Sequence, residues 1–156
     1  MSKWFRNIAA NPDDLTHVGD AISHFEELYE QYQKKLSIKG RVISEVSREL
    51  PDLAEKVHSH WKEVKAIYDF VEIRKDIALG NARRHFIEHY NRNLSASQVE
   101  KYAEIDKSVI PFLELLIEIN LLQSKWEAVS KGVESLGFQV KNITLMRQGG
   151  FEEATI

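Results

Sequence analysis

The residues best suited to chemistry lie in one stretch, His85-Phe86-Ile87-Glu88-His89, which places two imidazoles one helical turn apart around a glutamate. This spacing matches the inverted zinc-protease pattern, in which both histidines hold the metal and the glutamate acts as base. Such an enzyme needs a third ligand from a second domain, for which a chain of 156 residues has little room. We therefore expect these histidines to be solvated or to face a nucleic acid, with no metal required.

A second metal pattern is incomplete. Glu55 and His58, with Glu114 and Glu118 elsewhere, resemble part of the ligand set of di-iron helical bundles, but those sites need two Glu-x-x-His pairs and this chain has one. Surface ion pairs are the expected role of these residues. There is no cysteine, and the seven glycines never cluster as in phosphate-binding or dinucleotide-binding loops. We predict a protein that is not an enzyme and uses no cofactor.

The charges are unevenly distributed along the chain, although the net charge is only -3. Residues 1–55 hold 7 Lys and Arg against 10 Asp and Glu, residues 56–92 hold 8 against 5, and residues 93–156 hold 6 against 9. A basic middle can attract phosphate locally, because surface charges more than roughly 10 Å apart are largely screened at moderate salt. The overall acidity therefore does not exclude a nucleic-acid partner.

Cations and aromatic residues alternate in this basic middle, a combination that suits single-stranded nucleic acid. Cations follow the backbone there, and aromatic or guanidinium planes receive bases. Arg74, Asn81, His85 and Arg92 recur at helical spacings and should share one side. The open alternative is a set of solvated charges on a long helix whose aromatic residues face the core. The predicted DNA-binding residues are Arg74, Lys75, Arg83, Arg84, His85, Tyr90 and Arg92.

The elements that must position these residues are predicted to be helices, so the fold class is all-α. Asn11, followed by proline and two aspartates, has the composition of a helix start. From there apolar residues recur at spacings of three and four as far as Leu36, a heptad pattern that resumes after Gly40. Gly40 and Pro51 should break the rod, and the next helix should cover residues 52–91.

The second half of the chain is predicted to contain two more helices and a short third one. Ser97 and Glu100 have the spacing of a capping box for a helix that ends near Lys107. Residues 108–137 form a long apolar helix, with Pro111 in its first turn and Gly137 at its end. A turn and a short helix over residues 138–147 should follow. We expect one helical domain over residues 1–156, with residues 11–107 forming the N-terminal and central helices and residues 108–147 the assembly helices.

Apolar side chains cover nearly the whole circumference of the 108–137 helix, so one packing partner cannot bury them all. A membrane span is disfavoured, because the run is shorter than about 20 apolar residues and contains two carboxylates. Two alternatives remain, burial within a monomer and burial by sister subunits. Under the second, the predicted contact residues are Phe112, Leu113, Leu116, Ile119, Leu122, Phe138, Val140, Ile143 and Met146.

The tail from Ser135 to Arg147 resembles the C-terminal signature of the bacteriophage UvsY recombination mediators. The matching residues are Gly137, Phe138, Lys141, Ile143, Met146 and Arg147. The basic central segment of the same family is similar to a second set, Lys75, Ala78, Leu79, Ala82, Arg83 and Tyr90. The resemblance covers roughly residues 73–151.

This resemblance implies a mediator that binds single-stranded DNA and assembles through its C-terminal helices into a ring-like homo-oligomer of more than two subunits. Such a protein loads a RecA-like recombinase against the phage single-strand DNA-binding protein. It would work in the cytoplasm, that of the host cell if the protein is encoded by a phage, without a membrane partner. The alternative class is a coiled-coil structural or adaptor protein that binds partner helices and no DNA.

Overall fold

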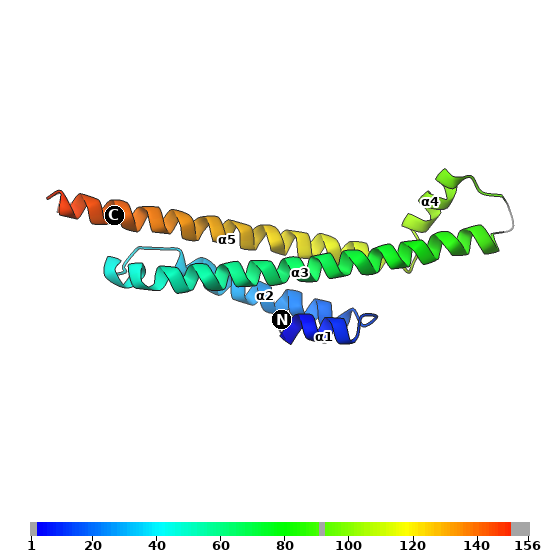
Figure 1. The fold of residues 1–156 in the computed structure, drawn as a ribbon, viewed down its shortest axis with the longest axis horizontal. Helices are drawn as coiled ribbons and strands as arrows, with labels where there is room; N and C mark the ends of the chain where they lie inside the picture. Colours follow the sequence, from blue (N-terminus) through cyan, green and yellow to red (C-terminus); the bar gives the residue numbers. More distant parts are fainter. Residues whose placement is uncertain (1–2, 91–92, 151–156) are drawn as a thin grey trace. The chain divides into compact units, whose positions relative to one another are not determined.

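The computed structural model describes residues 3–90 and 93–150, which contain five α-helices and no strand (Figure 1). These are α1 (Lys3–Ala10), α2 (Thr16–Lys35), α3 (Ile43–His89), α4 (Ala96–Glu104) and α5 (Ile110–Gln148). The predicted all-α class is confirmed. In these described ranges, no helix is long and apolar enough to cross a membrane.

The first helical boundary differs from the prediction, because α2 begins at Thr16 and not at Asn11. Asn11 instead completes α1, an unpredicted helix, and its N–H donates to the carbonyl of Asn7 at 3.3 Å. Pro12 explains the error, since a proline disfavours continued helix at the residue before it. The start of α2 is held by Asp14, whose carboxylate accepts the Thr16 N–H at 3.0 Å.

The predicted break at Pro51 is wrong, since α3 passes through this residue without interruption. A proline inside a helix deprives one carbonyl of its donor, here that of Ser47. Both Pro51 and Ser47 are exposed, so water can satisfy that carbonyl. Buried Val46 and Leu53 on either side hold the helix together by packing. The break at Gly40 is confirmed, and its φ of 74° lies in the left-handed region that favours glycine.

The fourth helix has its cap two residues earlier than predicted. Ser95 is the N-cap, and its hydroxyl accepts the N–H of Gln98 at 3.3 Å while the Gln98 side chain accepts the N–H of Ser95 at 2.9 Å. Ser97 lies inside the helix. The reason is that glutamine serves the third position of a capping box as well as glutamate does, which leaves Glu100 free for another contact.

The long apolar helix also extends further than predicted, because α5 continues through Gly137 to Gln148. A glycine inside a helix costs only about 1 kcal/mol, and buried Leu136 and Val140 flank it on the core side. The left-handed glycine of this region is Gly150, with a φ of 82°. Pro111 lies in the first turn of α5, as predicted.

Contacts divide the chain into two units that do not follow the order of the helices. Unit 1 contains the described residues up to Ile22 together with Glu63–Leu121, and unit 2 contains Ser23–Lys62 and the described residues from Leu122 onward. α2, α3 and α5 therefore contribute to both units. Each unit has its own buried apolar residues, and the single domain predicted for residues 1–156 stays a prediction.

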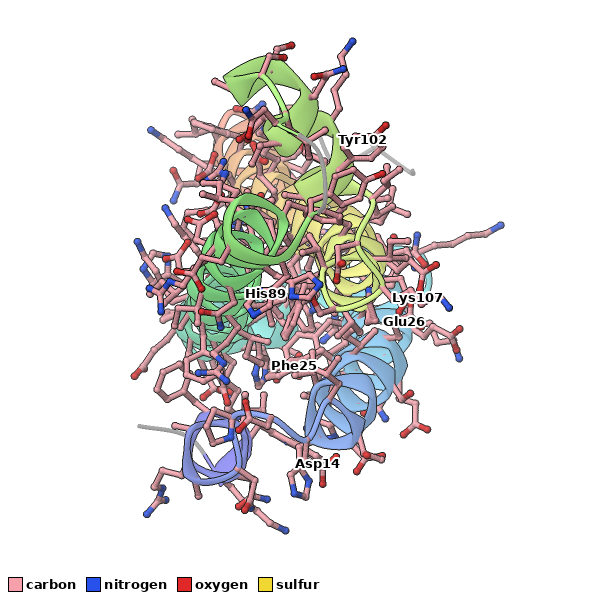
Figure 2. All side chains as sticks on the ribbon, turned by 90° about the vertical axis from the view of Figure 1, so that its right-hand side faces the viewer. Asp14, Phe25, Glu26, His89, Tyr102 and Lys107 are labelled. Carbon is pink, nitrogen blue, oxygen red and sulfur yellow. The ribbon has the colours of Figure 1, made fainter. Side chains whose placement is uncertain are left out.

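Unit 2 is centred on Trp126 of α5, which is fully buried. The ring of Trp126 lies 6.5 Å from that of Phe25 and 5.6 Å from that of Tyr32, both on α2, and 5.1 Å from His60 on α3. Figure 2 labels Phe25 where α2 turns it toward the interior. Aromatic packing of this kind joins all three helices of the unit.

Candidate nucleic-acid interface

Three of the predicted DNA-binding cations are held by carboxylates within unit 1. Arg74 pairs with Asp13 in the segment between α1 and α2, and Nζ of Lys75 lies 3.0 Å from Oδ1 of Asp76. Arg83 pairs with Glu100 of α4. Three of the five arginines and lysines predicted to bind DNA are therefore balanced by the chain's own anions.

Arg84 is different. It is exposed, and no ion pair involves it in the part of the chain that the structure describes. It lies opposite the buried Val71 and Ala82, and about a quarter turn around α3 from Arg83. The predicted Arg92 falls outside the described residues. Among the described residues, the predicted DNA-binding cations are therefore Arg84, which has no ion pair, and three paired cations that a competing anion would have to free.

The two histidines of the zinc-like pattern stack on each other. The ring centroids of His85 and His89 are 5.0 Å apart with an angle of 18° between the planes, and both residues are exposed. No cluster of three potential metal ligands occurs among the described residues. His85 is close enough to Asp106 to contribute to lowering the pKa of that carboxyl, although hydrogen bonds from Ser108 are the largest cause.

An aromatic cluster lies beside the histidines, where α4 packs on α3. Phe86 is 6.0 Å from Tyr90 and 5.7 Å from Tyr102, and the rings of Tyr90 and Tyr102 stack at 6.0 Å with an angle of 27°. Tyr90 and Tyr102 keep 46% and 39% of their surface exposed. Figure 2 labels Tyr102 on α4, His89 on α3 and Lys107 just before α5. Aromatic faces are therefore available at this end of unit 1.

Sequence reasoning missed Tyr102 and Glu100 as parts of this site. Tyr102 adjoins Val99 and Ala103, the two buried residues of α4, so an amphipathic pattern over α4 could have marked it. Glu100 offered no such pattern, because its role depends on a partner 17 residues away. We call Arg83, Arg84 and Tyr90 the cation-aromatic surface, and Glu100 and Tyr102 of α4 lie against it.

The ion pair within this surface has the geometry of an anion site. Arg83 Nε donates to Oε2 of Glu100 at 2.7 Å, and Arg83 Nη2 donates to Oε1. The hydrogen bonds from Arg83 lower the pKa of the Glu100 carboxyl, and those to Glu100 raise the pKa of the Arg83 guanidinium. A guanidinium in this two-point arrangement binds phosphate as readily as carboxylate.

The predicted assembly residues divide into buried and exposed sets. Ile119, Leu122, Val140 and Ile143 are buried by the chain itself. Phe112 and Leu116 are half-buried. Leu113, Phe138 and Met146 are exposed, and Leu113 belongs to a stripe at spacings of three and four on α5 that the sequence reasoning did not single out in full. That stripe is Ile110, Leu113, Ile117 and Leu121.

No protein-family model, curated protein or solved structure matches this chain.

Proposed function

We propose that this chain binds single-stranded DNA at the cation-aromatic surface and acts as a recombination mediator. The observation that carries the proposal is that Arg84, an exposed cation, and the exposed ring of Tyr90 lie near the same end of α3, beside Arg83. Arg83 and Tyr90 are seven residues apart, and Tyr90 directly follows His89, the last residue of α3, so both lie near the end of this helix. In proteins that bind single-stranded nucleic acid, cations contact the phosphates, and aromatic faces stack on bases of any sequence.

An oligomer that repeats the cation-aromatic surface would bind DNA more tightly than one subunit does. One copy offers few contacts, but copies linked by symmetry bind one DNA strand with an avidity well above that of a single subunit. The exposed stripe Ile110, Leu113, Ile117 and Leu121 is a candidate contact between subunits, because an isolated subunit gains nothing from four large apolar side chains facing water. We propose a homo-oligomer of more than two subunits joined there and through Phe138.

The partner proteins follow from the resemblance of the tail and the central segment to UvsY-type mediators. On that basis we propose that the DNA-bound oligomer loads a RecA-like recombinase in place of a phage single-strand DNA-binding protein. The site of action would be the cytoplasm, that of the host if the chain is encoded by a phage.

An adaptor without DNA binding is the second candidate, and one observation favours it. Arg74, Lys75 and Arg83 are all neutralised by carboxylates, as expected of charges that serve solubility and local structure. The exposed apolar stripe of α5 would then receive a helix of another protein.

The affinity of the protein for an oligo-dT strand distinguishes the DNA-binding mediator from the adaptor. The wild type should bind, and Tyr90→Ala should weaken binding by about 5- to 150-fold, since stacking contributes roughly 1–3 kcal/mol per base. Tyr90→Phe keeps the ring and should retain most of the affinity. Absence of binding by the wild type would favour the adaptor, and equal affinity of Tyr90→Ala and wild type would remove the tyrosine from the site.

A further inference from the structure

We propose that α4 is an internal occupant of the DNA site, which a DNA strand must displace, so that the chain limits its own binding. This inference rests on the proposed function and concerns the regulation of the same surface. Its basis is that α4 presents to α3 the two kinds of group that a nucleotide presents, an anion and a planar ring.

Glu100 takes the place of a phosphate. Its two carboxylate oxygens accept from two nitrogens of Arg83, with one contact of 2.7 Å, in the forked arrangement that a phosphate adopts with arginine. While this pair is intact, the Nε–Nη2 edge of Arg83 is occupied and its charge is balanced by Glu100. A strand that contacts Arg83 through this edge must therefore compete with Glu100.

Tyr102 takes the place of a base. Its ring stacks on that of Tyr90, with the centroids 6.0 Å apart, and its centroid lies 5.7 Å from that of Phe86, so Tyr102 covers one face of Tyr90 from the side of α4. A base that stacks on this face of Tyr90 must move Tyr102. Glu100 and Tyr102 belong to the same short helix, so displacement of α4 uncovers both Arg83 and Tyr90.

Few buried contacts hold α4, so the helix can be displaced. The helix has nine residues, and only Val99 and Ala103 are buried. Ala103 packs in a cluster with Ala82 and Val109, against which Ala78, Leu79 and Phe86 also pack, and the alanine that α4 contributes to it is a small side chain with little apolar area. The Arg83–Glu100 pair is exposed on both sides, at 41% and 42%, so solvent weakens it. Elements held by few buried contacts open at low cost.

The test compares the oligo-dT affinity of wild type, Glu100→Gln and Glu118→Gln across a salt series. Glu118 is exposed on α5 with no ion pair among the described residues, so its substitution is a control for the change in net charge. Glu100→Gln should bind about two- to five-fold more tightly at low salt, the range that the coupling of an exposed ion pair allows. Its log-log salt slope should steepen by about 0.7, one further phosphate contact to a single strand.

Each outcome decides something. If the wild type binds oligo-dT but Glu100→Gln binds no more tightly than Glu118→Gln, the role of α4 is overturned and the proposed function is intact. No binding by any of the three proteins overturns both. A second measurement needs no variant: hydrogen exchange of the wild type with saturating oligo-dT should show α4 amides losing protection. Unchanged or increased protection of α4 overturns the displacement.

Discussion

Arg83 on α3 and Glu100 on α4 form a two-point ion pair across 17 positions of the chain, with Nε 2.7 Å from Oε2. The pair joins the element that carries the candidate DNA contacts to the helix that covers them. Because each partner is about 40% exposed, the pair positions α4 more than it stabilises the fold.

The attachment of α4 should depend on its apolar contact more than on that ion pair. Ala103 is fully buried beside Ala82, so Ala103→Asp would place a carboxylate without a partner in an apolar cluster. We expect loss of α4 protection in hydrogen exchange and a fall of about 1–3 kcal/mol in the free energy of unfolding. Lys101→Asp introduces the same side chain at an exposed position of the same helix. Equal effects of the two variants would contradict the packing of Ala103.

The core of unit 2 should be sensitive to the loss of one ring. Trp126→Ala removes a side chain that is 0% exposed and contacts aromatic rings from α2 and α3. We expect a loss of about 3–5 kcal/mol, measured by urea unfolding. Phe138→Ala lies on the same helix at 68% exposure, and in dissociated protein it should change stability by less than about 0.5 kcal/mol. A smaller cost for Trp126→Ala than for Phe138→Ala would contradict a core of unit 2 centred on Trp126.

Much of this fold follows from local pattern, and the errors have a common cause. The break at Gly40 and the position of Pro111 depend on backbone chemistry that one residue determines, and both were predicted correctly. Pro51 and Gly137 were predicted to end helices, yet tertiary packing of the buried positions around them outweighs a penalty of a few kcal/mol or less. Burial of that kind is a property of the folded chain, and a local window of sequence does not contain it.

The candidate site was predictable in its residue types but not in its pairings. The concentration of cations and aromatic residues between residues 74 and 92 is visible in the sequence, and Arg84 is exposed as a binding residue requires. The partners Asp13 and Glu100 come from other helices or turns, and only the tertiary arrangement brings them to Arg74 and Arg83. Periodicity along one helix carries no information about such contacts.

His60 should make unit 2 less stable in mild acid. Burial is the main cause that lowers the pKa of His60, with smaller contributions from His24 and Lys56. The fold therefore favours the neutral imidazole, and stability should fall as the pH drops below about 6.5, where the unfolded chain takes up a proton that the folded chain resists.

The measurement for His60 is the urea midpoint at pH 7.5 and at pH 5.5. His60→Gln should lose less stability over this interval than the wild type, and His58→Gln, at an exposed neighbouring position, should behave as the wild type does. Burial raises the pKa of Glu63, which acts in the opposite direction, so the difference between variants isolates His60. An identical pH dependence of His60→Gln and wild type would refute this prediction.

Assembly should depend on the exposed stripe of α5. Ile117 is 63% exposed, so Ile117→Asp is tolerated by the folded subunit, whereas burial of an unpaired carboxylate between subunits costs several kcal/mol at each copy. We expect the variant to have the mass of a smaller species by light scattering at micromolar concentration. Gln139→Asp, an exposed polar position of the same helix, should leave the mass unchanged. A monomeric wild type would contradict assembly altogether.

The most direct test of the central claim is the salt dependence of oligo-dT binding by Arg84→Ala, followed by fluorescence anisotropy. Arg84 is exposed and outside every ion pair of the described residues, so its removal disturbs no internal contact of that kind. Lys34→Ala removes an equal charge from an exposed position on α2 and is the matched control. We predict that Arg84→Ala weakens binding and flattens the log-log salt slope by about 0.7 per subunit contact, while Lys34→Ala retains the slope of the wild type. Equal slopes for all three proteins, or no binding by the wild type, would contradict the account.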